Sequence, residues 1–522
     1  MNKSQRWSLI LFAIGVFMAQ LDNGIISAAL TTLIYEFDVS ANWGAWTVTI
    51  YTLGLAVSIP VVGKLSDRYG RKRLFLIEVF LFGLGSLLVA LSTSFEMMLV
   101  SRLIQSLGGG GIFLIASSHV LSTFPLEKQG AALGMLGGMN GIAAVLGPNV
   151  GAFILDVTGH WPWLFLINIP IAIFVLVAGW KLIQESKEDA AYSLDYPGIV
   201  LLALSILGVM YGLTNLSGAD LMKSFLQPEV YGFVGAGIAL FIVLLFWERQ
   251  VVRKEKDPIL PIRLMARPNY LLALLLGAFS GAILASVIFI PAYVEQVLGV
   301  AASKAGYFYT PLALASGIGA GGGGALVDRK GPIFAMVLAG VLSFVGAILF
   351  PIWVNETWEM IVASCILGMG FGIMLGAPIN MLATENTDNK GTALGTMSLF
   401  RQIGMTLGPT IYAGFIARAF LSLGDRIEKN LAEAGIDPAA VPAGEMSGLQ
   451  NLEYPELVAQ IQQIPVPPVR DAILSALQDA VSSGYGKLYA AAAVVSALSL
   501  VTTIALHFVR KAQAKTAVKA EN

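Results

Sequence analysis

The sequence predicts an all-α polytopic membrane protein, and three observations lead to that prediction. Of the 522 residues, 56% are hydrophobic and only 12% are charged, whereas a soluble domain carries about 25% charged residues. Apolar stretches of about 20 residues, the length that crosses a bilayer as a helix, recur along the whole chain. The sequence also repeats itself at a constant offset, as some transporters with duplicated helix bundles do.

The apolar stretches predict fourteen transmembrane helices bounded by charged residues, proline or glycine. The expected spans are 8–33, 43–63, 74–94, 96–121, 130–155, 162–184, 197–215, 229–248, 269–293, 304–326, 333–354, 358–383, 392–421 and 486–509. The first is too long for a secretory signal and is interrupted by Asp22, so we expect it to be retained. Lys and Arg gather after the even-numbered spans, which places both termini in the cytoplasm of a cell with a bacterial-type plasma membrane.

The repeat divides the chain into two halves of the same orientation. Gly63–Gly70 recurs as Gly324–Gly331, and Gly130–Gly134 recurs as Gly391–Gly395, both at an offset of 261 positions. Spans 1–6 therefore correspond to spans 9–14, with spans 7 and 8 inserted between them. The expected units are residues 1–190, the inserted pair 191–260, and residues 261–522. Parallel repeats of this kind place a substrate site near the membrane midplane, between the halves.

A long outer loop, 424–485, lies within the second half. It contains nine acidic and three basic residues, which fits the non-cytoplasmic side. Apolar residues at helical spacing in Arg470–Ser482 predict a short amphipathic helix there. The loop can be passive or functional, and the sequence leaves both open.

The connection between spans 2 and 3 combines glycines with clustered charges. The glycines allow a tight turn and close helix approach, and Asp67 can pair with a base or cap a neighbouring helix. Such a cluster can act as a gate that breaks when the halves separate, or it can simply anchor the topology by positive charge. The predicted gate residues are Gly63, Asp67, Arg68, Gly70, Arg71 and, from the second copy, Asp328 and Arg329.

This connection resembles the major facilitator superfamily signature Gly-x-x-x-Asp-Arg-x-Gly-Arg-Lys/Arg. The match is full in the first half, whereas Pro332 replaces the arginine in the second. Fourteen spans with a central insert resemble the fourteen-span drug:proton antiporter family (EmrB/QacA-like). The resemblance implies a major facilitator fold with two six-helix halves and two inserted helices.

Two further segments resemble motifs of that family. Arg102-Leu-Ile-Gln105-Ser-Leu-Gly108 is similar to Arg-x-x-Gln-x-x-Gly, which implies a role for Arg102 in proton coupling. The second segment is similar to the antiporter signature Gly-x-x-x-Gly-Pro-x-x-Gly-Gly, which implies export, although alanine stands at 143 and 152 where glycine is usual. Its antiporter-helix residues are Gly147, Pro148 and Gly151.

Asp22 is the clearest charged residue inside a span. A charge at the bilayer centre costs about 2.5–3.5 kcal/mol on insertion scales, so it normally faces a cavity or a partner. The surrounding Leu21–Leu30 resembles the family's Leu-Asp-x-Thr-Ile-Val-Asn-x-Ala-Leu motif, with Gly24 and Ser27 in place of Thr and Asn. We expect Asp22 and Arg102 to couple proton movement to opening of a cavity; a purely structural ion pair is the alternative.

Other buried or polar positions give weaker predictions. Glu78, near the inner surface, is expected to snorkel or pair with loop bases. Arg401 lies deep enough to need a cavity or an acidic partner. Flexible methionines and aromatics suit promiscuous apolar ligands. The possible cavity residues are Gln105, Arg401, Gln402, Met139 and Phe113.

Composition also argues against several classes of function. The net charge of −1 gives no basic excess for nucleic acid, and the single Cys365 cannot form an internal disulfide. The three histidines lack metal-ligand spacing, and no P-loop is present for ATP. We therefore expect no metal, no cofactor and no enzyme activity.

The predicted function is proton-driven export of hydrophobic drugs or other small amphipathic compounds. The expected partners are such a substrate, protons and membrane lipids, and we expect a monomer. Export of an envelope lipid or glycolipid is the runner-up, with loop 424–485 handling delivery. A polytopic membrane enzyme or a sensor is the alternative outside transport.

Overall fold

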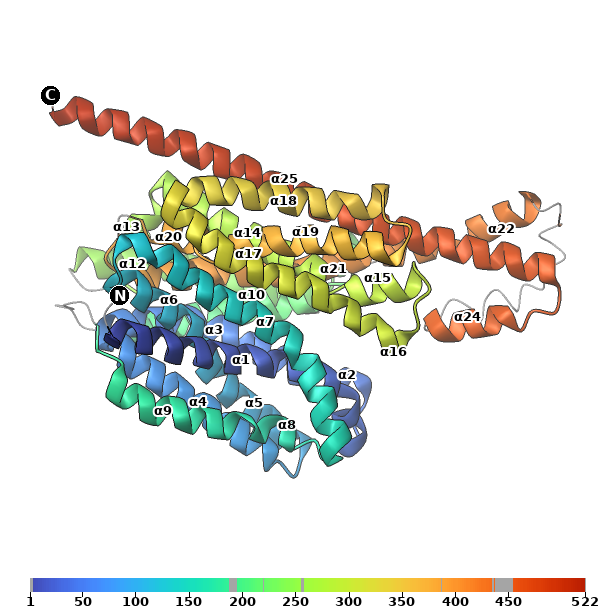
Figure 1. The fold of residues 1–522 in the computed structure, drawn as a ribbon, viewed down its shortest axis with the longest axis horizontal. Coiled ribbons are helices and arrows are strands. Elements are labelled where there is room, and N and C mark those ends of the chain that lie inside the picture. The colour runs from blue at the N-terminus through green and yellow to red at the C-terminus, as the bar shows by residue number, and fades with distance from the viewer. Residues whose placement is uncertain are drawn as a thin grey trace.

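The computed structural model describes residues 3–186, 195–218, 220–254, 258–385, 387–433, 436 and 454–521. These residues form an elongated bundle of helices, and no strand occurs among them. Both termini lie at the same end of the bundle (Figure 1), which we call the terminal end. Long apolar helices running side by side are what the composition predicts, because every backbone polar group in a bilayer must be paired within its own helix.

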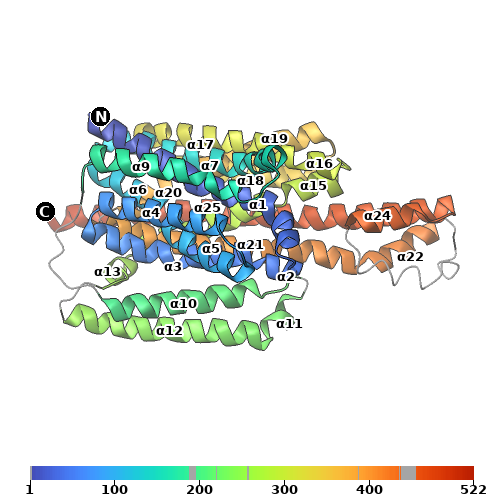
Figure 2. The same ribbon diagram turned by 90° about the horizontal axis from the view of Figure 1, so that it is seen from below.

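The first half, residues 3–186, contains nine of these helices. They are α1 (Lys3–Glu36), α2 (Ala41–Gly44), α3 (Trp46–Tyr69), α4 (Arg71–Ala90), α5 (Phe95–Gly109), α6 (Ile112–Thr123), α7 (Leu126–Thr158), α8 (Trp163–Leu166) and α9 (Asn168–Leu182). The inserted segment follows with α10 (Tyr196–Thr214), α11 (Leu221–Phe225), α12 (Pro228–Arg253) and α13 (Ile262–Met265). In Figure 2, α10 and α12 lie together along one flank of the bundle, and α10 packs against α3.

The second half begins at α14. Its elements are α14 (Pro268–Val287), α15 (Ile290–Gln296), α16 (Ala302–Ala305), η1 (Gly306–Phe308), α17 (Tyr309–Lys330), α18 (Pro332–Ile352), α19 (Thr357–Leu375), α20 (Pro378–Thr384), α21 (Lys390–Leu421), α22 (Leu423–Glu433), α24 (Tyr454–Gln462) and α25 (Pro467–Glu521). The halves meet chiefly where α7 packs on α17 and α3 packs on α21.

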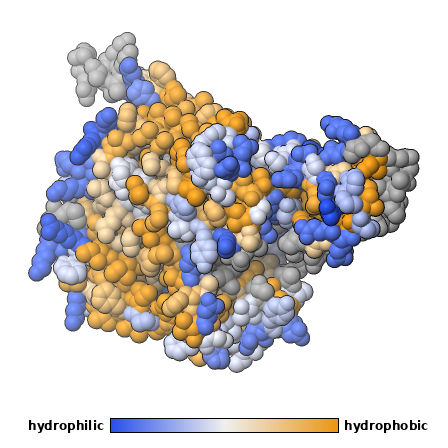
Figure 3. Space-filling model, turned by 45° about the vertical axis from the view of Figure 1, so that its right-hand side comes forward, coloured by the Kyte–Doolittle hydropathy of each residue, from blue (hydrophilic) through white to orange (hydrophobic). Residues whose placement is uncertain are grey.

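Twelve spans in the described chain are long and apolar enough to cross a membrane, and the bent helix α7 makes a thirteenth. The helix α21 runs through the expected span 392–421 but is rich in glycine and threonine and is not among these. The protein is therefore a multi-pass membrane protein with twelve or thirteen apolar spans, and the count of fourteen stays a prediction. On the face shown in Figure 3, hydrophobic residues cover the middle of the bundle, and hydrophilic residues lie toward its ends.

The outer segment differs from its prediction in one respect. The amphipathic stretch Arg470–Ser482 is not a separate short helix, because it forms the first turns of α25, which continues unbroken through the expected span 486–509. The glycines at 484 and 486 do not interrupt the helix. Together with α22 and α24, which pack on α25, these turns form a projection beyond the bundle (Figure 1). Its core is continuous with the main hydrophobic core and contains Ile427, Leu431, Leu457, Ile461, Ile473 and Leu477.

Candidate functional site

A buried ion pair joins α1 to α5. Arg102 Nη1 lies 2.7 Å from Asp22 Oδ2, and the side chains of Arg102 and Asp22 are only 1% and 0% exposed. Gln105, one turn along α5, accepts a hydrogen bond from Arg102 at 2.6 Å and donates one to Asp22 Oδ1 at 2.9 Å. The structure thus brings together the two residues expected to couple protons. Gln105, predicted as a possible cavity residue, belongs to this network.

Three residues that the sequence reasoning missed complete the network. Asn168 donates to Asp22 Oδ1 at 3.0 Å and to Ser86 Oγ at 3.2 Å, and Gln105 also donates to Ser86 at 2.7 Å. The ring of Tyr51 lies 4.1 Å from the Arg102 guanidinium, a cation–π contact. The signal that could have found Asn168 is its position, an amide side chain at the start of an apolar span. Burying a charge pair is tolerated because these partners replace its water.

The network leaves a few polar atoms without partners. Among the described residues, Arg102 Nε, Asn168 Oδ1 and Tyr51 Oη are buried and make no hydrogen bond. A buried polar atom without a partner costs about 1–3 kcal/mol.

Glycines let α1 and α7 touch just one turn from the ion pair. A Cβ placed on Gly24 would lie 2.7 Å from Gly147 Cα and 2.9 Å from Pro148 Cδ. Glycine at 24, where the resembling motif has threonine, thus has a structural cause, because it admits the backbone of the antiporter helix. Gly151, one turn further along α7, is buried as well.

The charge cluster around Asp67, predicted as a gate, makes contacts that cross between the halves. Asp67 accepts hydrogen bonds from Gly391 N at 2.9 Å, Thr392 N at 2.8 Å and Thr392 Oγ1 at 3.0 Å. It therefore caps the N-terminus of α21, where backbone N–H groups and the helix dipole favour an anion. Arg71 lies 2.8 Å from the same carboxylate and donates to Ser118 at 2.8 Å.

The second copy makes the mirror contact. Asp328 accepts from Gly130 N and Ala131 N, each at 2.8 Å, and so caps α7 of the first half. All four partners obey the offset of 261 found in the sequence. Lys390 adds a further link between the halves by donating to the Leu121 carbonyl. Both caps lie at the terminal end of the bundle, so this end is held closed by two equivalent contacts.

The remaining residues of the predicted gate lie near the two caps or on the surface. Gly70 has φ of 103° at the junction of α3 and α4, a conformation that favours glycine. Glu185, which the sequence reasoning missed, accepts from Lys72 N at 2.9 Å and Arg73 N at 3.2 Å at the start of α4. Arg68 lies over the Tyr69 ring, and Arg329 is exposed. Neither arginine takes part in the two caps.

Glu78 contradicts its prediction. Its side chain is only 2% exposed, and it accepts a hydrogen bond from Gly111 N at 2.9 Å, at the junction of α5 and α6. It neither snorkels nor pairs with loop bases, because α4 turns it toward the interior of the first half. Of the histidines, His119 hydrogen-bonds Ser186 at 3.1 Å. No group of three or more potential metal ligands occurs in the parts of the chain that the structure describes.

Arg401, a predicted cavity residue of the second half, is half-buried on α21. Arg401 donates to Ser280 Oγ at 3.2 Å and lies 3.6 Å from Met397 Sδ. Within the described ranges it has no acidic partner. Gln402 is buried next to it in sequence, while Phe113 and Met139 pack at the edge of the main core.

This fold and these motifs define a membrane transporter rather than an enzyme. The Major Facilitator Superfamily model matches residues 12–409, and the chain belongs to that superfamily. The chain is 58% identical over 498 residues to YfiU of Bacillus subtilis (strain 168), an uncharacterized MFS-type transporter, covering 95% of this chain and 96% of that protein. It is 30% identical over 523 residues to Multidrug resistance protein 3 of the same strain, covering 98% and 96%.

The fold also resembles solved transporters. A bacterial homologue of the human lysosomal transporter Spinster, in an inward-facing and occupied conformation, aligns with a TM-score of 0.51 and covers 98% of each chain. The identity is 16%, so this likeness concerns the fold alone.

Proposed function

We propose that this protein is a proton-driven antiporter that exports hydrophobic or amphipathic small molecules. The observation that carries the proposal is the buried Asp22–Arg102 pair with its shell of Gln105, Ser86 and Asn168. A titratable carboxylate at this depth is expensive and is usually functional. The name of Multidrug resistance protein 3, at 30% identity, agrees with a drug-like substrate.

Protonation of Asp22 gives the pair a way to act on the helices. A proton on the carboxylate removes the charge that holds Arg102, so the contact between α1 and α5 weakens when the proton binds. The helix α1 also touches α7 at Gly147, and α7 carries Gly130 of the gate at its other end. Along α7 these two points are about 25 Å apart at 1.5 Å per residue, and the helix bends between them. The helix α7 therefore links proton occupancy at Asp22 to the gate.

The proton gradient supplies enough energy for export. Moving one charge through 100 mV is worth about 2.3 kcal/mol, which supports a roughly 50-fold gradient of a neutral substrate. In this proposal α7 and α21 complete a set of fourteen spans in the plasma membrane, with the terminal end in the cytoplasm.

The charged residues inside the bundle influence which substrate charge is preferred. Asp22 is neutralised by Arg102, whereas Arg401 has only Ser280 and Met397 as partners in the described chain. An uncompensated guanidinium attracts carbonyl, sulfonyl or carboxylate oxygens and repels cations. We therefore propose neutral or anionic amphipathic compounds with a hydrogen-bond acceptor as the preferred substrates.

The test is Asp22→Asn protein in inverted membrane vesicles, with uptake of an amphipathic dye driven by an imposed pH gradient. We expect gradient-driven uptake to be lost, while the protein remains folded and inserted. Asp156→Asn is the matched control, because Asp156 is an exposed acid near the far end of α7. Normal gradient-driven uptake by Asp22→Asn would show that the pair is structural.

A further inference from the structure

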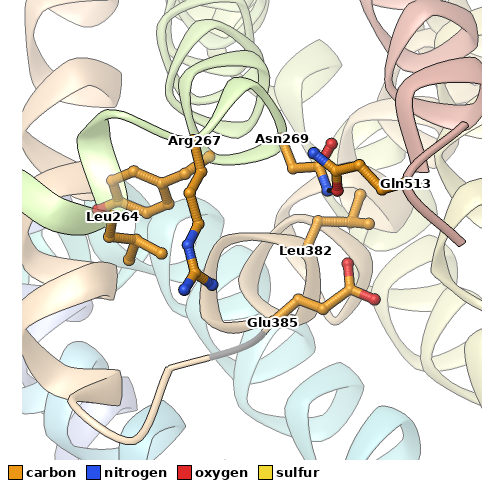
Figure 4. Close-up of a pocket in the computed structure, with 7 residues that line it drawn as sticks. Leu264, Arg267, Asn269, Leu382, Glu385 and Gln513 are labelled. Carbon is orange, nitrogen blue, oxygen red and sulfur yellow. Dashed lines mark hydrogen bonds between the residues drawn. The ribbon is translucent and has the colours of Figure 1, made fainter. Parts of the chain in front are cut away.

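A small polar cavity opens at the terminal end of the second half, away from the Asp22 network. Its volume is about 230 Å³, and it lies between the start of α14, the end of α20 and the later part of α25. Arg267 extends into it from the α13–α14 turn, Glu385 reaches in from another side, and Asn269 and Gln513 lie next to each other at its margin (Figure 4).

The cavity lies at the level where apolar spans end. Arg267 directly precedes the apolar span Pro268–Gln296, and Glu385 directly follows the apolar span Thr357–Thr384. Two span ends meeting at one cavity place it at the membrane surface. Phospholipid headgroups occupy this layer.

The charges around the cavity favour a ligand with a single negative charge. Arg510 forms an ion pair with Glu385, and Arg267 adds a second guanidinium, so the three groups together carry one net positive charge. A guanidinium binds phosphate oxygens in a bidentate manner and is the side chain best suited to do so. Basic pockets between transmembrane helices commonly hold acidic lipid headgroups.

The cavity also offers an acceptor that needs a donor. Asn269 Nδ2 donates to Gln513 Oε1 at 2.6 Å. The other end of the amide, Asn269 Oδ1, is shielded and has no hydrogen-bond partner among the residues that the structure describes. An occupant with a hydroxyl group would pair this oxygen, whereas a bare phosphate diester would leave it unpaired.

We propose that this cavity binds the headgroup of a monoanionic phospholipid that carries a hydroxyl, with phosphatidylglycerol as the representative. Its phosphate pairs with Arg267, and its glycerol hydroxyl donates to Asn269. The transported compound is a different ligand, because sites for drug-sized molecules occupy roughly 300–1,000 Å³.

The bound headgroup is placed to act on the gate. Tyr270, in the cavity wall, donates a hydrogen bond to the Ala393 carbonyl at 2.9 Å. Glu385 starts the connection that leads to Gly391 and Thr392, the two residues capped by Asp67. A headgroup that fixes Arg267 and Glu385 therefore stabilises the connection that holds the terminal end closed.

Lipid binding to the purified, delipidated full-length protein tests the proposal, and it does not depend on what the protein transports. The three lipids, with the same acyl chains, are phosphatidylglycerol, phosphatidylmethanol, which has the same charge but no hydroxyl, and phosphatidylcholine, which has no net charge. We expect affinity to fall in that order. Arg267→Gln should weaken phosphatidylglycerol binding about ten-fold, the effect of losing a hydrogen bond to a charged group, whereas Arg263→Gln, an exposed arginine outside the cavity, should not.

The hydroxyl contact has its own test. Asn269→Ala should abolish the preference for phosphatidylglycerol over phosphatidylmethanol while leaving phosphatidylmethanol binding unchanged. A separate arm adds soluble glycerol phosphate; if it competes as well as the lipid does at equal concentration, the site is for a soluble phosphate and the lipid assignment is wrong. Equal binding of all three lipids, or unchanged binding by a folded Arg267→Gln protein with an unaltered melting temperature, would also overturn the proposal.

Discussion

Asp67 and Asp328 make the same contact in opposite directions. Each aspartate lies near the C-terminal end of its own helix, α3 or α17, and accepts two backbone N–H groups from a helix of the other half, Asp67 from α21 and Asp328 from α7. The duplication has thus produced a pair of reciprocal caps. The copies differ in one respect: Arg71 supports Asp67 at 2.8 Å, whereas its counterpart in the second half is Pro332.

This asymmetry predicts unequal effects on the gate. Asp328→Ala loses a helix cap, worth about 0.5–2 kcal/mol. Asp67→Ala also leaves Arg71 buried without its carboxylate, which costs about 3–5 kcal/mol. Asp328→Asn keeps one acceptor oxygen but turns an NH2 group toward the second backbone N–H, so it should lose part of the cap. Asp67→Asn also removes the charge that pairs with Arg71 and should lose more. Spin labels at Leu126 and Phe334, both exposed near the terminal end, would report the separation of the halves.

The labels are introduced after replacing Cys365, the single cysteine of the chain. We expect the fraction of molecules with a long distance between the two labels to increase most in Asp67→Ala. Asp388→Ala, which removes an exposed acid at the same end, is the control. Equal shifts for Asp67→Ala and Asp328→Ala would mean that Arg71 contributes nothing to closure.

The contact between Gly24 and Gly147 predicts a steric effect. An alanine at 24 would place its Cβ 2.7 Å from Gly147 Cα, so α1 and α7 must separate, at a cost of about 1–3 kcal/mol. The melting temperature of detergent-purified Gly24→Ala should therefore fall. Gly235→Ala is the comparison, because nothing lies within 4 Å of that position on α12. It should gain about 0.5–1 kcal/mol from helix propensity, and a similar loss in both variants would contradict the packing argument.

Arg401 predicts a change in substrate preference. Arg401→Gln should reduce transport of an anionic dye about ten-fold relative to a cationic dye of similar size, since hydrogen bonds to charged groups are worth about 1.5–3 kcal/mol. Arg418→Gln removes an exposed arginine from the other end of the same helix and serves as the control. Transport of both dyes by Arg401→Gln in vesicles, compared at equal protein, gives the ratio. An equal decrease in the transport of both dyes would mean that Arg401 supports folding and does not select the substrate.

The outer projection separates drug export from the runner-up, lipid delivery. Leu431 and Ile461 are completely buried in its core, and replacing each with alanine costs about 2–5 kcal/mol. Limited proteolysis of the double variant should cut the projection, while dye export continues at the wild-type rate. Loss of export with an intact bundle would favour a role for the projection in handing on the substrate.

Much of this arrangement could be predicted from the sequence, because charged residues and glycine motifs are easy to recognise in an apolar chain. The offset of 261 located both caps, and the cost of a charge in the membrane singled out Asp22 and Arg102. Neutral polar residues could not be assigned to the site in this way. Ser86 and Asn168 stand 82 positions apart, and only packing of α4 against the start of α9 brings them to the same carboxylate.

Two other features depend on neighbours that a single sequence does not reveal. Glu78 has the spacing of a surface residue, yet α4 turns it inward to meet Gly111. The amphipathic pattern of Arg470–Ser482 predicted a helix correctly, but periodicity cannot show whether one helix ends before the next begins. The glycines after it permit either outcome.

The length of α25 has a practical consequence. Its 55 residues form one helix from Pro467 in the outer projection to Glu521, about 80 Å at 1.5 Å per residue. A stiff rod of this kind tilts as a whole, so a force applied at one tip displaces the other. In the topology proposed above, an antibody fragment or nanobody bound to the projection would therefore act through α25 on the opposite face of the membrane and arrest the protein without entering the cell.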